Sequence, residues 1–307
     1  MNELEQYYQE LPDKIRTLLK APDEERIKFI KKPKFIHHVK AEKIFEKLDM
    51  LLDSPPISRI RSLMILGDSN NGKTVIMKKF QEIKKKLPSE DNPNPLEYEN
   101  PVLYIQAPVK ASLKDLYNSI FISFKVPFKS NETYAEKEAK IKHYCSINGI
   151  KMLIIDEIQG GTVGSPRQQR EFVNGIKNIS NLLEIPIVLV GIPSAIGLVN
   201  SDHQLKSRFV PTKIRKWDFD EDYLSLLYSI EMTLPLKKPS YIYENETLAK
   251  NILELSDGLI GDIIEICNLL AIEAINSKKE KIENSMLRKI PFIPVSSQKG
   301  VLYAEEI

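Results

Sequence analysis

The chain has 307 residues, of which 42% are hydrophobic and 28% are charged, a composition typical of folded globular proteins that excludes bulk disorder. Its 44 basic and 42 acidic side chains leave a net charge of only +2, so any binding to nucleic acid must use a local basic strip. The two cysteines, Cys145 and Cys267, lack the spacing of a disulfide framework or a zinc site and fit a reducing cytoplasm, and no apolar run predicts a signal peptide or a membrane span.

Residues 1–50 are dense in charge and predict an N-terminal extension of short helices. From about residue 60, short runs that are apolar on both faces alternate with amphipathic stretches, a pattern typical of buried parallel strands joined by helices. The runs predicted as strands are Leu63–Gly67, Val102–Gln106, Met152–Asp156, Ile187–Gly191 and Phe209–Ile214. The predicted crossover helices cover residues 73–87, 112–124, 134–148 and 167–183. This alternation predicts an α/β core at 51–217, with a parallel five-stranded sheet flanked by helices.

After Trp217 the strand-like runs stop. Four further segments predict helices, at residues 219–232, 245–256, 260–277 and 283–289. We therefore expect residues 218–290 to form a small all-helical domain. The remaining residues, 291–307, show no period and are expected to form a tail.

A phosphate-binding motif follows the first predicted strand. The sequence Gly67-Asp68-Ser69-Asn70-Asn71-Gly72-Lys73-Thr74 satisfies GxxxxGK[ST], which a chain of this length matches by accident about one time in a hundred. Glycines let backbone N–H groups wrap phosphates, and the N-terminus of the next helix adds a partial positive charge. We expect Lys73 to reach the β- and γ-phosphates and the Thr74 hydroxyl to ligate Mg²⁺. The whole motif thus predicts a nucleotide-binding loop.

The third predicted strand, Met152–Asp156, ends in two acids, Asp156 and Glu157. Beside the phosphate-binding loop, such a strand is typical of a Walker B motif. Asp156 is then expected to hold the Mg²⁺ shell, and Glu157 to polarise the attacking water as a general base. The second acid favours hydrolysis over phosphoryl transfer to a small molecule, because a kinase must keep water out.

With these motifs, the sequence resembles the AAA+ ATPases and, more narrowly, the TniB family of bacterial transposition ATPases, relatives of TnsC. The resemblance runs from about residue 34 to 290. It is carried by GDSNNGKT (67–74), VLYIQAP (102–108), MLIIDEIQ (152–159), GSPRQQREFVNGIKNISNLLEIPIVLVG (164–191), QLKSRF (204–209) and LPLKKPS (234–240).

The resemblance implies an AAA+ P-loop NTPase core with a small helical lid, ATP and Mg²⁺ as cofactors, and a bacterial cytoplasmic location. It further implies a homo-oligomer, as a ring or helical filament, on double-stranded DNA. There such proteins recruit a DDE-type transposase and a TniQ-like target-selection protein.

Four residues match the family pattern directly, namely Lys73, Thr74, Asp156 and Glu157. Arg208 lies where AAA+ proteins place an arginine finger, which would reach the γ-phosphate on a neighbouring subunit; a surface arginine is the alternative. Ser194 stands near the position of the polar sensor-1 residue that follows the fourth strand, and is a weak substitute for it. The turn Gly258–Gly261 lacks the usual sensor-2 arginine, so the resemblance implies slow hydrolysis.

A basic stretch follows the second predicted strand. Lys110, Lys114, Lys129 and Thr133 bracket the next helix, and Thr133 opens a capping box that Glu136 completes. In related AAA+ proteins this region faces the central channel, so we expect these four residues to contact the DNA backbone. An ordinary basic surface with an ordinary helix cap is the alternative.

Two other functions share these motifs. One is a helicase-loader or initiator-type AAA+ ATPase that serves replication. The other is a DNA scaffold that ATP stabilises with negligible hydrolysis. The segment GSPRQQREF (164–172) favours transposition over replication.

Overall fold

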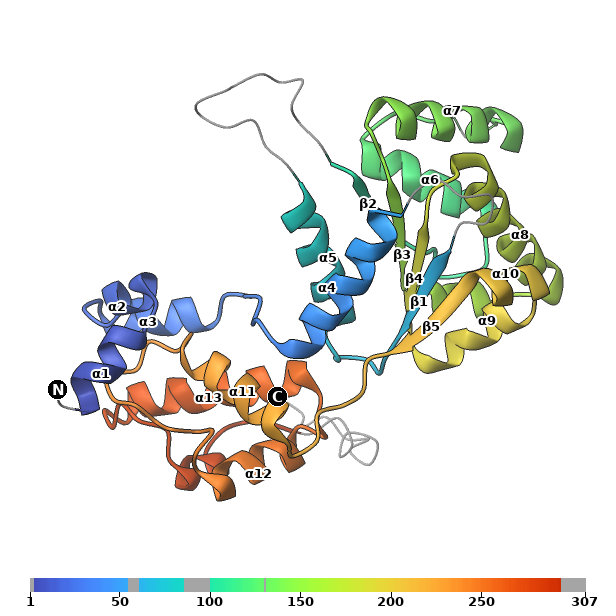
Figure 1. Cartoon of the computed structure of the whole chain (residues 1–307). Coiled ribbons are helices and arrows are strands. Elements are labelled where there is room, and N and C mark those ends of the chain that lie inside the picture. Colours follow the sequence, from blue (N-terminus) through green and yellow to red (C-terminus); the bar gives the residue numbers. More distant parts are fainter. Residues whose placement is uncertain (1–2, 55–60, 86–99, 130, 294–307) are drawn as a thin grey trace, which may run out of the picture. The chain divides into compact units, whose positions relative to one another are not determined.

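The computed structural model of the chain describes residues 3–54, 61–85, 100–129 and 131–293 (Figure 1). The chain divides into two compact units, an α/β unit at Lys43–Arg215 and a helical unit made of Met1–Glu42 and Lys216–Ile307. No helix in the described ranges is long and apolar enough to cross a membrane.

The α/β unit contains the predicted parallel five-stranded sheet, which is confirmed. The strand order is β2-β3-β4-β1-β5. The strands are β1 (Ser62–Leu66), β2 (Val102–Gln106), β3 (Met152–Asp156), β4 (Ile187–Gly191) and β5 (Phe209–Lys213). Every residue of β1, β3 and β4 is buried, as expected for strands covered on both faces.

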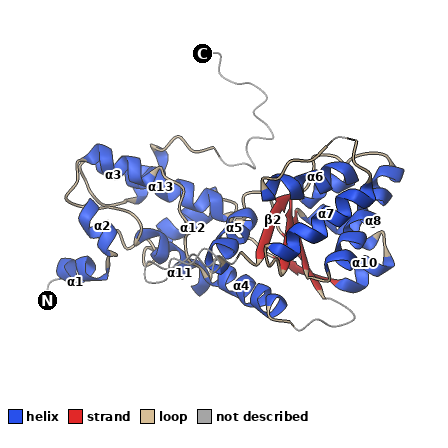
Figure 2. Ribbon diagram, turned by 90° about the horizontal axis from the view of Figure 1, so that it is seen from above, coloured by secondary structure: helices blue, strands red, loops and turns tan. Residues whose placement is uncertain are grey.

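Helices cover both faces of this sheet, with α5 on one side and α6 to α8 on the other (Figure 2). Their bounds are α5 (Lys73–Lys84), α6 (Leu113–Phe124), α7 (Tyr134–Ile147) and α8 (Pro166–Leu183). Alternate strand residues such as Leu153 and Ile155 pack in one core with Ile120 of α6 and Phe172 of α8. Shorter helical segments follow β3 and β4: η2 (Ile158–Thr162), η3 (Pro193–Ala195), α9 (Ile196–Asn200) and α10 (His203–Arg208).

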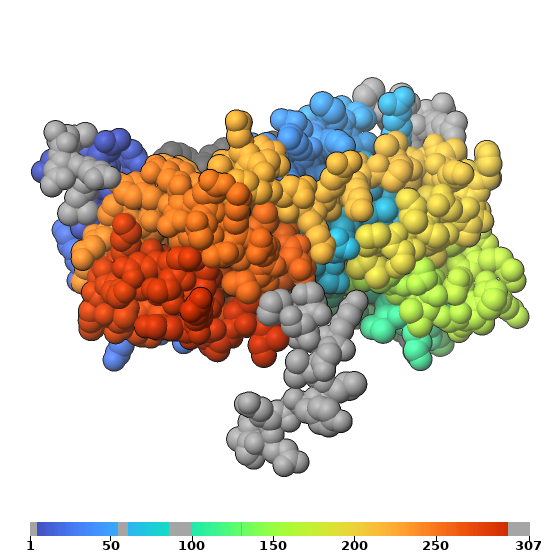
Figure 3. All heavy atoms as spheres, turned by 90° about the horizontal axis from the view of Figure 1, so that it is seen from below, coloured from blue at the N-terminus to red at the C-terminus, as the bar shows by residue number. Residues whose placement is uncertain are grey.

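The helical unit combines both ends of the chain. Its helices are α1 (Glu3–Glu10), α2 (Asp13–Leu18), α3 (Asp23–Ile30), α11 (Glu221–Glu231), α12 (Glu246–Leu255), α13 (Ile260–Asn276) and η4 (Asn284–Arg288). Helix α4 (Val39–Leu52) begins in this unit and continues into the α/β unit. Figure 3 shows α11 to α13, orange to red, along one face of the helical unit.

The N-terminal residues share the core of this helical unit. Ile30 and Ile36 are buried in one cluster with Trp217, Tyr223 and Ile263. Residues 3–42 therefore pack with the C-terminal helices and form no separate extension, whereas the C-terminal part of α4 belongs to the α/β unit. The sequence pattern does not reveal this pairing, because the contacts join residues about two hundred positions apart.

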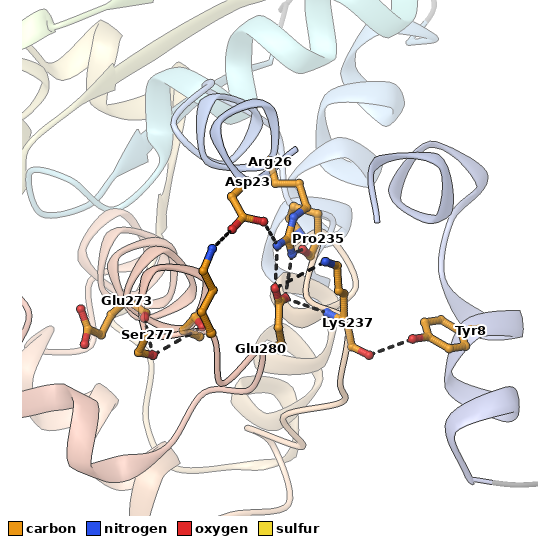
Figure 4. A network of polar contacts seen from close by, with 10 residues as sticks. Tyr8, Asp23, Arg26, Pro235, Lys237, Glu273, Ser277 and Glu280 are labelled. Carbon is orange, nitrogen blue, oxygen red and sulfur yellow. Dashed lines mark hydrogen bonds and ion pairs between the residues drawn. The ribbon is translucent and has the colours of Figure 1, made fainter. Parts of the chain in front are cut away.

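A buried ion pair fastens α3 to the segment after α13 (Figure 4). The fully buried guanidinium of Arg26 donates hydrogen bonds to Glu280 Oε1 at 2.6 Å, Glu280 Oε2 at 2.7 Å and the Pro235 carbonyl at 2.9 Å. Arg26 also donates to Asp23 Oδ1 at 2.5 Å, and Lys278 pairs with the same carboxylate. Burial raises the pKa of Glu280, but the bonds from Arg26 and the Lys237 amide outweigh burial and hold that pKa below its usual value.

Candidate functional site

Residues 67–72 connect the end of β1 to α5, whose first two residues are Lys73 and Thr74. The Gly67 amide donates to the Gly191 carbonyl at 3.1 Å, which fastens the loop to the end of β4. Asn70 (φ 60) and Gly72 (φ 76) adopt left-handed backbone conformations, and this lets the chain turn into α5. Because the first N–H groups of a helix lack partners within it, the loop and α5 together form a site suited to phosphate.

Lys73 is the first residue of α5 and is only 7% exposed. Its Nζ donates to the Gly67 carbonyl at 2.9 Å and to the Asp68 carbonyl at 2.7 Å. Burial lowers the pKa of Lys73, and the nearby carboxylates of Glu157 and Asp156 oppose that effect. A lysine held on a flexible stem by carbonyls can exchange them for phosphate oxygens, so its position fits the predicted role.

Asp156 brings the loop and the Walker B strand together. It is fully buried at the end of β3, and Thr74 Oγ1 donates to its Oδ2 at 2.6 Å. The Tyr104 hydroxyl donates to the same oxygen at 2.8 Å, and the Glu157 amide donates to Oδ1 at 2.8 Å. A hydroxyl and a carboxylate in contact suit Mg²⁺, which prefers oxygen ligands and usually completes its shell with water and phosphate.

Glu157 is exposed and adopts a left-handed backbone (φ 57), an uncommon conformation that is often found at functional sites. Its carboxylate accepts a hydrogen bond from the Gln159 amide group. The oxygen of that amide accepts in turn from the Ile192 N–H at 3.4 Å. Gln159 therefore links the Glu157 carboxylate to the segment after β4. A Cβ on Gly191 would lie 2.8 Å from Gln159 Oε1, so glycine at 191 makes room for this link.

Two residues of the site, Gln159 and Tyr104, are not among those expected from the sequence. Both lie within motifs that carry the family resemblance, MLIIDEIQ (152–159) and VLYIQAP (102–108), and the strands β3 and β2 of these motifs are neighbours. Tyr104 pairs in register with Ile154, two residues before Asp156. Burial and the adjacent Asp156 raise the pKa of Tyr104, so its hydroxyl remains a hydrogen-bond donor. A polar residue two positions from the end of β2 is the signal that could have indicated it.

Ser194 and Arg208 lie apart from these hydrogen bonds. Ser194 is exposed in η3, and its side chain forms no hydrogen bond within the described residues. Arg208 ends α10 and donates to Asn181 Oδ1 of α8 at 2.8 Å. The sensor role of Ser194 and the arginine-finger role of Arg208 on a neighbouring subunit stay predictions.

The four residues expected to contact DNA are all exposed: Lys110, Lys114, Lys129 and Thr133. Lys114 lies in the first turn of α6, and Thr133 is the N-cap of α7. The predicted capping box is confirmed, because Thr133 Oγ1 accepts from the Glu136 amide at 3.3 Å and Glu136 Oε2 accepts from the Thr133 amide at 2.7 Å.

The family model described as Bacterial TniB protein matches residues 26–219, well over half of the chain. The chain belongs to the TniB family. None of the curated proteins matches it.

Solved structures with the same fold are AAA+ ATPase domains. Cdc6p from Pyrobaculum aerophilum has a TM-score of 0.58 and 17% identity, covering 90% of this TniB-family chain and 72% of that chain. The ORC2 protein of Aeropyrum pernix, in ADPNP–ADP complexes, has a TM-score of 0.56 and 15% identity over 85% and 70% of the two chains. The ORC1 protein of that organism, in complex with DNA, has a TM-score of 0.55 and 13% identity over 86% and 68%. At these identities the likeness establishes the fold alone, and it confirms the AAA+ P-loop fold predicted from the sequence.

Proposed function

We propose that this TniB-family chain binds ATP with Mg²⁺ and hydrolyses it slowly. It assembles on double-stranded DNA as a ring or helical filament, and it recruits a DDE-type transposase and a TniQ-like target-selection protein. The contact between Thr74 Oγ1 and Asp156 Oδ2, at 2.6 Å, carries the nucleotide part of this proposal, because it joins the two motifs of a P-loop ATPase. The family match carries the transposition part.

Different residues of the site bind the phosphates and the metal. Backbone N–H groups of residues 67–74 and the N-terminus of α5 hold the phosphates, and Lys73 offsets their charge. Thr74 and Asp156 hold the metal, with Tyr104 orienting the Asp156 carboxylate through its 2.8 Å hydrogen bond. Bound Mg²⁺·ATP supplies the phosphoryl group and the charge stabilisation that its transfer requires.

Glu157 is the proposed general base. The carboxylate takes a proton from an attacking water, which requires that it be free to accept. In the structure the Gln159 amide occupies one of its oxygens. This contact holds the carboxylate toward the segment after β4 and leaves its other oxygen able to accept, and we propose that the fixed orientation keeps basal turnover slow.

Arg208 is proposed to act on the nucleotide of the next subunit. Its guanidinium donates to Asn181 within its own chain, and this bond must be given up when the arginine reaches a neighbouring phosphate. Assembly on DNA would then couple turnover to the presence of neighbours.

Phosphate release, measured with and without duplex DNA, tests this function together with electron micrographs of the same samples. We expect slow release that DNA stimulates, and ordered assemblies that require ATP. Lys73→Ala should abolish nucleotide binding and assembly. Assemblies that form with ATP while no phosphate is released would identify a scaffold, and the absence of both nucleotide binding and assembly would refute the proposal.

A further inference from the structure

The helical unit contains a cavity of about 250 Å³ that the proposed function does not use. Side chains of α1, of the end of α11 and of the segment before α12 line it. Four of them are tyrosines: Tyr7, Tyr228, Tyr241 and Tyr243. Tyr7 is buried and the other three are half-buried. The rings of Tyr228 and Tyr243 meet edge to face, with centroids 5.2 Å apart. Aromatic rings thus form much of the wall.

Three carboxylates share the cavity with these rings, those of Glu10, Glu231 and Glu244. Glu10 and Glu244 are exposed, whereas Glu231 is only 1% exposed. No lysine, arginine or histidine is found among the described residues that line the cavity. The lining is therefore acidic as well as aromatic.

Glu231 fixes the shape of the wall. Its Oε1 accepts the N–H groups of Ser240 at 2.6 Å and Tyr241 at 2.8 Å, and its Oε2 accepts that of Ile242 at 2.9 Å. Tyr241 adopts a left-handed backbone (φ 50) at this point. Three bonds to one carboxylate hold the segment in place before any ligand arrives, which reduces the entropic cost of binding.

The electrostatic environment of the cavity disfavours further negative charge. Burial raises the pKa of Tyr7, Tyr228 and Tyr243. Nearby carboxylates raise each pKa further, chiefly Glu231 at Tyr7, Glu10 at Tyr228 and Glu244 at Tyr243. Carboxylates and the negative faces of aromatic rings both attract cations. The same groups repel phosphate, so nucleic acid does not fit this cavity.

We infer that this cavity binds the guanidinium group of an arginine side chain from a partner protein. The volume lies below the range of about 300–1,000 Å³ typical of small-molecule sites and suits a single side chain. A guanidinium group stacks on aromatic rings and donates to carboxylates in a planar fork, which matches both features of the lining. Binding here does not depend on nucleotide, so the inference stands apart from the proposed function.

Nuclear magnetic resonance of the full chain, with labelled tyrosine rings and no nucleotide, tests the inference. The probes are N-acetyl-arginine amide and its neutral isostere, N-acetyl-citrulline amide. We expect saturable shifts of the Tyr228 and Tyr243 rings with the arginine probe and an affinity at least about tenfold lower for the citrulline probe, because the neutral group cannot form charge-assisted hydrogen bonds. Tyrosine-to-phenylalanine variants assign the signals.

The double variant Glu10→Gln, Glu244→Gln removes the two exposed charges and leaves Glu231, which shapes the wall, in place. It should weaken the arginine probe by about tenfold or more, whereas Glu254→Gln, an exposed change on α12, should leave its affinity unchanged. Equal binding of both probes, no saturable shift, or an unaffected double variant would overturn the inference. Sedimentation of the protein alone tests whether the arginine comes from a second copy of this chain. Self-association that the double variant abolishes would overturn the assignment to a partner protein.

Discussion

Replacing Glu280 with glutamine should destabilise the helical unit specifically. Glu280 accepts two hydrogen bonds from Arg26, whose side chain is fully buried, at 2.6 and 2.7 Å. Glutamine keeps the size of the side chain but removes its charge and one acceptor oxygen. Arg26 then retains Asp23 and the Pro235 carbonyl as partners.

The expected magnitude follows from these remaining partners. Breaking a buried pair costs about 3–5 kcal/mol when it leaves a charge uncompensated. Because Arg26 keeps Asp23 at 2.5 Å, we expect the low end, about 3 kcal/mol at neutral pH. The effect also depends on pH. Since the folded state lowers the pKa of Glu280, its stabilisation is complete above the unfolded pKa of about 4.3 and is lost as the pH falls through the folded pKa.

The fluorescence of Trp217 reports the unfolding of the helical unit, because Trp217 is the single tryptophan of the chain and lies in the core of this unit. Urea unfolding followed by its fluorescence should give the destabilisation at neutral pH, and the difference from wild type should shrink below about pH 4. Glu254→Gln, the matched control on the exposed face of α12, should change stability by no more than about 0.5 kcal/mol. If the Glu280→Gln chain is as stable as this control, the Arg26–Glu280 ion pair does not contribute substantially to holding α3 in the helical unit.

The remaining predictions concern turnover. Glu157→Gln should leave ATP binding intact and slow phosphate release by about 10²–10⁴, the usual contribution of a general base. Gln159→Leu should raise basal release by about tenfold, because the amide no longer holds the Glu157 carboxylate toward the segment after β4; reduced release would contradict the inhibitory role of this hydrogen bond. Arg208→Ala should spare nucleotide binding at low subunit concentration and lower turnover in assemblies by about 10³ or more, measured as release against concentration. Unchanged turnover there would exclude an arginine finger at this position.

The core of the site could be predicted because its signals are local. Strand β3 and residues 67–74 are each defined by a short run of residue types, and a parallel sheet brings the ends of its strands to one edge. The contact of Thr74 with Asp156 follows from that arrangement. A single side chain whose role depends on its orientation gives no such pattern. The role of Gln159 therefore becomes apparent only from its two hydrogen bonds in the structure.

The less predictable parts of the fold are short or distant in sequence. Helices α9 and α10 have five and six residues, too few to show a helical period. The packing of residues 3–42 with the C-terminal helices depends on contacts such as that of Arg26 with Glu280, 254 positions away. The dense charge and the prolines of this segment predicted short helices, but no local pattern indicates with which core these helices pack.

The structure also divides the proposed DNA-binding residues into two groups. Helix α6 has 12 residues and is about 18 Å long. Lys110 and Lys114 lie at its start, whereas Lys129 and Thr133 follow its end. The two groups are therefore separated along the chain by the whole of α6, and they can be tested separately.

The group at the start of α6 should carry more of the DNA affinity. At the other end, the Thr133 hydroxyl already serves the capping box, and the Glu136 carboxylate beside it repels phosphate. Lys114→Ala should weaken binding equally across sequences and flatten the slope of log K against log salt by about 0.9 for each phosphate that Lys114 neutralises. Thr133→Val should cost α7 about 1 kcal/mol of stability and leave that slope unchanged. Filter binding over a salt series, with ATP, measures both slopes, and a slope that falls for Thr133→Val but not for Lys114→Ala would reverse this assignment.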